Sequence, residues 1–221
     1  MKTTFKFLLG SFLLLITNFI LGQHHLHQHQ PHLHKHNGFV RCATVEYDQL
    51  RRNENPKTGT NLQFEAWLQN EIKNFKQQKG GTRLPVLTIP VVVHVIHNGD
   101  AVGSGENITD AQVLSQIQVL NEDFRRMANT NGHNTNPVGA DVEIEFCLAT
   151  VDPNGNATNG IDRVNMGQAS WDRNPIENTL KPQTIWDPNN YLNMWTCRFG
   201  GGASSLLGYA QFPDNSGLAG M

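Results

Sequence analysis

The sequence has little cysteine and almost no excess of either charge. Only three cysteines occur in 221 residues, and an odd count in an exported protein leaves one thiol over. Cys147 and Cys197 both lie in strand-like runs, but a disulfide requires Cα atoms within about 7 Å. The sequence therefore leaves open whether these two cysteines are paired or free. Lysine and arginine number 17 against 19 acidic residues, for a net charge of -2. This balance predicts neither a nucleic-acid partner nor attraction to an anionic membrane.

Short catalytic motifs are also absent from the sequence. It contains no HExxH, no CxxC, no GxSxG turn and no GxxxxGK loop. His94 and His97 are three residues apart on a predicted strand, so they point to opposite faces and cannot hold one ion. We interpret them as core or ladder residues. Glu143 and Glu145 share a strand face and are interpreted as exposed charges rather than paired acids. Motifs alone therefore give no active site.

The N-terminus resembles a secretory signal. Two lysines precede an apolar run, Phe7–Leu21, and Gly22 offers a small residue at the cleavage point. The run is shorter than the ~20 apolar residues of a membrane-spanning helix, so cleavage is favoured over a membrane anchor. We expect residues 1–22 to be removed and the remainder to be secreted without an anchor.

Two segments separate this signal from the globular part. Residues 23–36 are a low-complexity arm with seven histidines, which is either a weak Zn²⁺ or Cu²⁺ scavenger or, as we prefer, a spacer. Residues 37–83 predict a small helical segment. Thr60 and Gln63 have capping-box spacing, and apolar residues follow at helical spacing. The basic stretch Lys79–Arg83 is a candidate cleavable linker.

Residues 84–221 alternate strand and helix patterns, which predicts an α/β (α+β) fold. Residues 86–97 are apolar on both faces, as in an interior strand. Residues 109–127 carry an apolar helical stripe, and residues 141–151 alternate as a half-buried strand. A strand, a helix and a strand in this order predict a parallel crossover.

The rest of the sequence predicts three short strands and one long loop. Residues 161–164 are expected as a short return strand, and residues 165–190 as an ordered surface loop. Residues 191–199 have the apolar density of a buried strand that extends the sheet. After a glycine-rich turn, residues 206–212 are free to run antiparallel as the edge strand, ending at Pro213.

Five blocks between about Thr88 and Pro213 give the sequence a family resemblance. In order, they read LTIPVVVHVIH, ITDAQVLSQIQVLNEDFRR, VEIEFCLATVDPNGNATNGI, WDPNNYLNMWTCRF and LLGYAQFP. This set resembles the pappalysin/cytophagalysin family of secreted zinc metallopeptidases in the metzincin clan. The resemblance implies the upper part of a catalytic domain, a twisted mixed sheet backed by a helix, with an antiparallel edge strand above the cleft.

The resemblance assigns substrate-binding residues to that edge strand. In the family, the edge strand pairs with an extended protein or peptide substrate. Carried over, the substrate-binding residues are Leu206, Leu207, Gly208, Tyr209 and Ala210. The alternative is that these residues only close the sheet. Gly208 favours substrate pairing, because glycine in a strand permits close backbone approach.

The family's zinc helix, HExxHxxGxxH, has no counterpart before Met221, so no catalytic residue is carried over. We expect the chain as given to hydrolyse nothing, whether it is a fragment or a truncated product. The resemblance implies zinc in a full-length form, and it also allows calcium sites further along. It assigns residues 37–83 to the propeptide of a zymogen. There, Cys42 matches a cysteine switch that ligates the zinc, although Ala43 stands where glycine is expected. The alternatives are that Cys42 is a structural disulfide partner or an inert thiol.

A second hypothesis belongs to another class of protein. The chain would be a non-catalytic secreted protein that binds peptides with its sheet or sequesters metal. An in-frame HExxHxxGxxH shortly after the codon for Met221 would favour the peptidase. Substrate preference is not readable, because the selective pocket of the family lies beyond these residues.

Overall fold

The computed structural model describes residues 35–79 and 85–211, all within one unit of the chain, Leu33–Met221. The signal prediction for residues 1–22, most of the histidine-rich arm and the core of the linker lie outside the described residues. Among the described helices, none has the length and apolar character needed to span a membrane.

The central strand of the main sheet is β3 (Leu87–His97), which confirms the prediction for residues 86–97. Six consecutive residues, Val91 to Ile96, are buried because their side chains, all apolar except that of His94, face protein on both sides of the sheet. Every strand that pairs with β3 runs parallel to it. These partners are β4 (Ile144–Leu148), β5 (Ile161–Asn165) and β6 (Leu192–Thr196).

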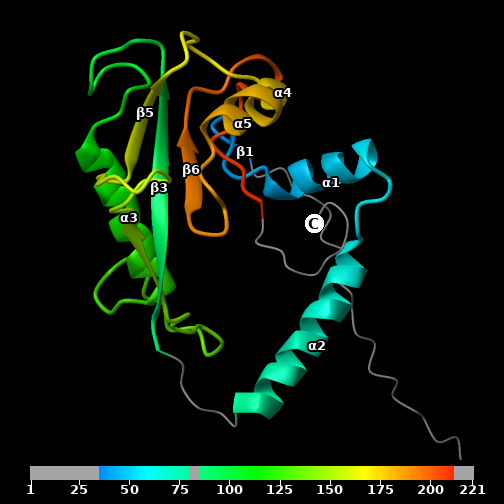
Figure 1. Cartoon of the computed structure of the whole chain (residues 1–221). Helices are drawn as coiled ribbons and strands as arrows, with labels where there is room; N and C mark the ends of the chain where they lie inside the picture. Colours follow the sequence, from blue (N-terminus) through cyan, green and yellow to red (C-terminus); the bar gives the residue numbers. More distant parts are fainter. Residues whose placement is uncertain (1–34, 80–84, 212–221) are drawn as a thin grey trace, which may run out of the picture. The chain divides into compact units, whose positions relative to one another are not determined.

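β4 and β5 lie end to end along one edge of β3. β4 pairs with residues 87–91 and β5 with residues 93–97, whereas β6 pairs with residues 91–95 and overlaps both. Because a strand has only two edges, β6 must occupy the other one, as Figure 1 shows. The segment predicted as a return strand therefore pairs with β3 in parallel. Gly160, with φ 73°, precedes it, and an added Cβ there would lie 2.7 Å from Ala149 N.

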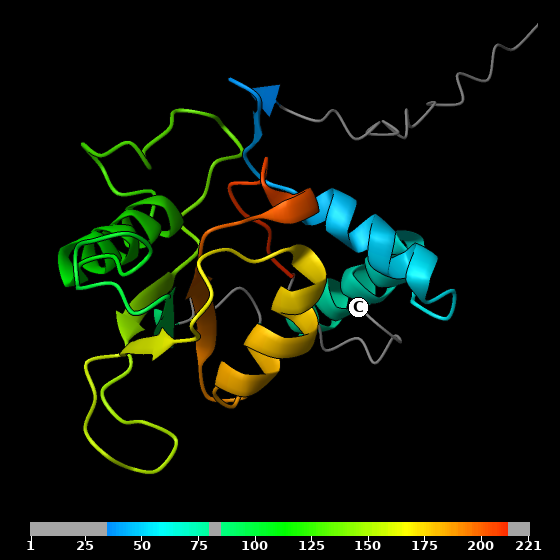
Figure 2. The ribbon, with the colours of Figure 1, turned by 90° about the horizontal axis from the view of Figure 1, so that it is seen from above.

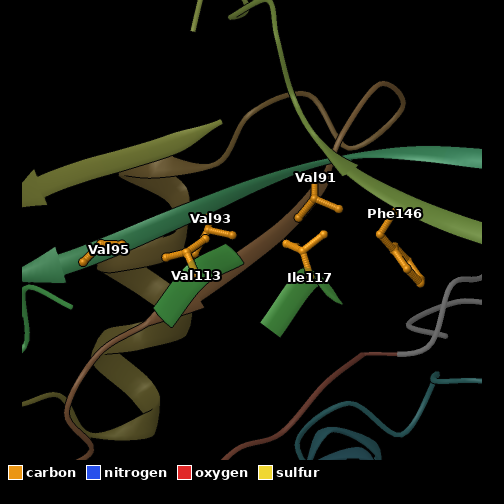
Figure 3. Packing of buried hydrophobic residues seen from close by; sticks show 6 residues of the cluster. All are labelled: Val91, Val93, Val95, Val113, Ile117 and Phe146. Carbon is orange, nitrogen blue, oxygen red and sulfur yellow. The ribbon is translucent and has the colours of Figure 1, made fainter. Parts of the chain in front are cut away.

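One face of the sheet is covered by α3 (Asp110–Phe124). The predicted capping box is confirmed, because Thr109 accepts from the N–H of Gln112 while the Gln112 side chain accepts from the N–H of Thr109. Figure 3 shows the apolar cluster between helix and sheet. Its buried members are Val91, Val93, Val95, Val113, Ile117 and Phe146.

The opposite face carries a continuous helical segment. It consists of α4 (Arg173–Pro175), the π-helical turn η1 (Ile176–Leu180) and α5 (Lys181–Thr184). Figure 2 shows α3 and this segment on opposite sides of the strands. Ile176 and Leu180 are buried with Ile96 and Trp171. The prediction of a surface loop is wrong for residues 173–184, because two apolar residues one turn apart suffice to anchor a short helix.

His94 lies within the sheet on this second face and is fully buried. Its Nδ1 is 2.7 Å from Asp162 Oδ2, and its Nε2 is 2.9 Å from Asn193 Oδ1. The same Asn193 oxygen accepts from the N–H of Trp186, which fixes the amide orientation and makes His94 Nε2 the donor. Both ring nitrogens are engaged inside the protein, so the interpretation of His94 as a core residue is confirmed.

Two helices precede the sheet in the chain. α2 (Asn61–Lys79) confirms its predicted capping box, since the N–H of Thr60 donates to Gln63 Oε1 at 2.8 Å. None of the side chains from 61 to 77 is buried, so its apolar face joins neither cluster. α1 (Thr44–Glu54) was not predicted, because Thr44 and Tyr47 are its only buried residues and make no periodic pattern.

A two-residue strand pair stands at the start of the described chain. β1 (Lys35–His36) pairs antiparallel with β2 (Phe39–Val40), across a turn in which Asn37 and Gly38 have positive φ. Such a turn suits asparagine and glycine, which tolerate the left-handed conformation. The last two residues of the arm, Lys35 and His36, thus belong to an ordered element.

Candidate functional site

The segment 205–210, which we call the pairing edge, is hydrogen-bonded to residues 40–44. Its backbone supplies both donors and acceptors, and every bond is 2.8 or 2.9 Å long. The donors and acceptors are Val40 N–H to Ser205 O, Leu207 N–H to Val40 O, Ala43 N–H to Gly208 O, and Ala210 N–H to Thr44 Oγ1. The two segments run parallel, with one bridge between Val40 and Leu206. The edge can therefore pair with an extended chain, and residues 40–44 occupy it here.

The pairing edge differs from the antiparallel strand expected over residues 206–212. Residues 207–211 form no regular strand, and the pairing described for the edge is parallel and internal to the chain. Leu207 is 60% exposed. No close backbone approach requires glycine at position 208, because an added Cβ there would meet nothing within 4 Å. Tyr209 is the residue of this edge whose side chain makes the most polar and aromatic contacts.

A tight loop positions the edge. Gly201, with φ 57°, opens the short helix η2 (Gly201–Ala203), and the N–H of Gly202 donates to Asp172 Oδ2 at 3.1 Å. Asp172 also caps the N-terminus of α4 by accepting from the N–H of Arg173. These two N–H groups hold the pKa of Asp172 below its usual range. The loop and the helix therefore share one carboxylate anchor.

A half-buried polar cluster lies beneath the edge. The hydroxyl of Tyr209 donates to Glu177 Oε1 at 2.6 Å, and Lys181 Nζ donates to the same oxygen at 2.5 Å. Burial would raise the pKa of Glu177, but these hydrogen bonds outweigh it and lower the pKa. Burial and the Glu177 carboxylate raise the pKa of both Tyr47 and Tyr209. The cluster joins α1, η1, α5 and the pairing edge.

The three cysteines are all free thiols. Cys147 pairs with Pro90 on one edge of β3, and Cys197 follows β6 on the other, so the central strand separates them. Burial raises the pKa of Cys197 to about 11. Cys42 is exposed beside the pairing edge, with its Sγ 3.1 Å from the Thr44 hydroxyl.

No group of histidine, cysteine, aspartate or glutamate in the described ranges could hold a metal ion. Zinc, which the family resemblance implies, thus has no fitting ligand set among these residues, and we derive no catalytic step through it. In the described part of the chain, the pairing edge is bonded to residues 40–44 and a polar cluster lies beneath it.

Known proteins that are similar to this chain are found among solved structures. No protein-family model and no curated protein matches the chain. The chain is similar to mirolysin. A Tannerella forsythia promirolysin variant is 35% identical, with a TM-score of 0.55, over 78% of this chain and 54% of that one. Mirolysin in complex with compound 9 is 44% identical, with a TM-score of 0.50, over 58% of this chain and 47% of that one. Mature T. forsythia mirolysin with a cleaved peptide is 43% identical, with a TM-score of 0.49, over 59% of this chain and 48% of that one.

The chain spans about half the length of these mirolysin structures. The likeness shows an α/β fold of the metzincin-like catalytic type, with a sheet that is predominantly parallel, and it supports a metallopeptidase family.

Sequence reasoning missed three residues of the cluster beneath the edge. Glu177 and Lys181 have the i, i+4 spacing of a helical ion pair, a signal that was hidden in a stretch interpreted as a loop. Tyr47 lay in a polar run and gave no signal, because its partners are far away in the chain.

Proposed function

We propose that this chain is the N-terminal part of a secreted zinc metalloendopeptidase zymogen of the pappalysin/cytophagalysin type. The single observation that carries the proposal is the 35% identity with promirolysin over 78% of the chain. The five sequence blocks agree with it, and so does a parallel sheet with one helix on a face. Zinc would supply the activated water, and its ligands belong to a segment that these 221 residues do not include.

In this proposal the pairing edge receives substrate. Leu207 and Gly208 present backbone groups to an extended peptide, as residues 40–44 use them in this structure, and Leu206 lies opposite the peptide as it lies opposite Val40 here. Backbone pairing of this kind binds peptides with little regard to sequence. Tyr209 and Ala210 extend the same surface.

Residues 37–83 would act as the propeptide. Two observations support this role. Residues 40–44 cover the edge, and the similarity extends over 78% of the chain with promirolysin but over 58% with mirolysin. Cys42 is exposed on the covering segment, where a thiolate could ligate a catalytic zinc held by the rest of the zymogen.

The test uses the longer protein whose gene continues past the codon for Met221. We expect it to carry HExxHxxGxxH and to cleave a protein substrate in a zinc-dependent, chelator-sensitive way after removal of residues 37–83. The 221-residue chain should show no such cleavage. Cys42→Ala should shorten the lag before activity, whereas Cys147→Ala, which changes an exposed thiol elsewhere, should not.

Two results would contradict the proposal. A stop codon directly after Met221 in the natural gene would favour the non-catalytic secreted protein instead. A Cys42→Ala zymogen with the lag of the unmodified protein would remove the cysteine switch while leaving the peptidase in place.

A further inference from the structure

Tyr47 is the most buried large side chain of α1. It contacts groups of residues 173–209, and Arg51 of α1 also lies over its ring. It is 8% exposed and lies against the Tyr209 ring, with the centroids 4.8 Å apart. Three cations approach its ring, with Arg51 Cζ at 5.8 Å, Arg173 Cζ at 5.7 Å and Lys181 Nζ at 5.9 Å from the centroid. We name this surrounding set the Tyr47 cage. Its members are Arg173, Glu177, Lys181 and Tyr209.

The cage is held together without Tyr47. Glu177 and Lys181 pair within one helical turn, and Tyr209 donates to the same carboxylate oxygen. Lys181 Nζ also lies 4.9 Å from the centroid of Tyr209 and 5.5 Å from that of Trp195. These contacts are internal to residues 173–209, so Glu177, Lys181 and Tyr209 should keep their arrangement when the tyrosine is absent. Arg173 also pairs with Glu54 of α1 at 3.2 Å.

Two cavities flank the Tyr47 side chain. One of about 290 Å³ lies toward Leu206 and Ala203, and one of about 320 Å³ lies toward Phe64 and Ala210. Tyr47 is the one residue that lines both. Removal of its side chain would therefore join them into a space large enough for an aromatic side chain and its backbone.

The chemistry of the cage selects a phenol. Cations over a ring face are attracted to aromatic groups and gain little from aliphatic ones. The Glu177 carboxylate is an acceptor that favours a hydroxyl donor, and burial and this carboxylate together raise the pKa of the Tyr47 hydroxyl. An apolar ligand in the same space would leave this half-buried acceptor with fewer partners.

We infer that the Tyr47 cage is a binding site for a phenolic side chain, which Tyr47 fills in this chain and a tyrosine of a peptide ligand fills when residues 37–83 are removed. The second half of this statement rests on the proposed function. The first half does not, since it concerns only contacts within the chain.

The experiment uses the full chain with Tyr47→Ala and 4-methylphenol as the probe. At about ten times its dissociation constant, the probe should raise the melting temperature by roughly 3 °C. Toluene, of the same shape without the hydroxyl, should raise it by less than half as much. The unmodified chain, whose cage is filled, should not respond. Addition of Lys181→Leu to Tyr47→Ala should abolish the response.

The matched control is Phe146→Ala, which removes a buried ring from the all-apolar cluster beneath α3. It should respond to toluene at least as strongly as to 4-methylphenol. An equal preference for 4-methylphenol in both variants, or a Tyr47→Ala chain that prefers toluene, would overturn the inference. The N-acetyl amides of tyrosine, phenylalanine and leucine should bind Tyr47→Ala in that order, as measured by calorimetry.

Folding of the variant is itself informative. A ligand that binds the native state favours folding, so a Tyr47→Ala chain that remains unfolded at every 4-methylphenol concentration counts against the site. Tyr47→Leu, which fills more of the space, serves as the second variant and should bind the probe more weakly than Tyr47→Ala. None of these readouts needs zinc or peptide hydrolysis, so failure of the site and failure of the proposed function are separable.

Discussion

At the scale of single residues, the side chain of Glu177 connects several elements of the fold. Its carboxylate accepts from Lys181 on the next turn and from Tyr209 on the pairing edge, and it raises the pKa of Tyr47. A half-buried carboxylate with this number of donors is stabilised in its charged form. The state of one carboxyl group therefore affects three elements at once.

This carboxylate predicts a pH dependence of stability. The folded pKa of Glu177 lies below its ordinary value of 4.5, so the unfolded chain takes up a proton more readily. Its contribution is present above about pH 4.5 and is lost as the pH falls through the lower folded pKa. We expect the difference in unfolding free energy between the unmodified chain and Glu177→Gln to shrink below pH 4.5. Urea denaturation at pH 7, 5, 4 and 3 measures it, and a difference that grows on acidification would contradict this account.

At the scale of elements, two helices begin with the same capping motif but differ in what they pack against. α3 and α2 both begin with a threonine and glutamine capping box. α3 buries Val113 and Ile117 against the sheet, whereas no side chain from 61 to 77 is buried in α2. Local capping therefore starts both helices, and only packing couples one of them to the core.

The matched pair Thr109→Ala and Thr60→Ala tests this difference. Loss of the N-cap at α3 should lower the global unfolding free energy by about 1 kcal/mol, because α3 unfolds with the sheet. The same change at α2 should reduce helix content by circular dichroism with little effect on global unfolding. Urea titration followed by tryptophan fluorescence and by circular dichroism distinguishes the two. Equal losses in global stability would show that α2 belongs to the core.

At the scale of the molecule, the pairing edge is covered by an earlier segment of the same chain. Residues 40–44 and 205–210 lie more than 160 positions apart and are joined through backbone groups and the Thr44 hydroxyl. The contact includes Ala43, which is 5% exposed and donates its N–H to Gly208 O. Access to the edge is thus set by how firmly this segment is held.

Ala43→Pro tests that coupling, because it removes the donor to Gly208 while keeping a small side chain. Amide exchange at Leu207 and Ala210 should accelerate by a factor of roughly 5–10, the effect of about one hydrogen bond. Exchange at Val93 and Val95 in β3 should not change. Ala43→Gly retains the N–H and serves as the control, with a smaller acceleration expected. Unchanged exchange at Leu207 in the proline variant would mean that the edge is held by other contacts.

The sequence by itself determined the elements whose pattern is local. The β-branched run of β3 and the capping box and stripe of α3 specify a strand and a helix through side-chain periodicity alone. Order along the chain then predicted the parallel pairing of β3 with β4. Only the tertiary structure decided that β5 is parallel, that residues 173–184 are helical, and that Tyr47 lies in a cage. The physical reason is that these features depend on contacts between residues far apart in the chain, which periodicity does not record.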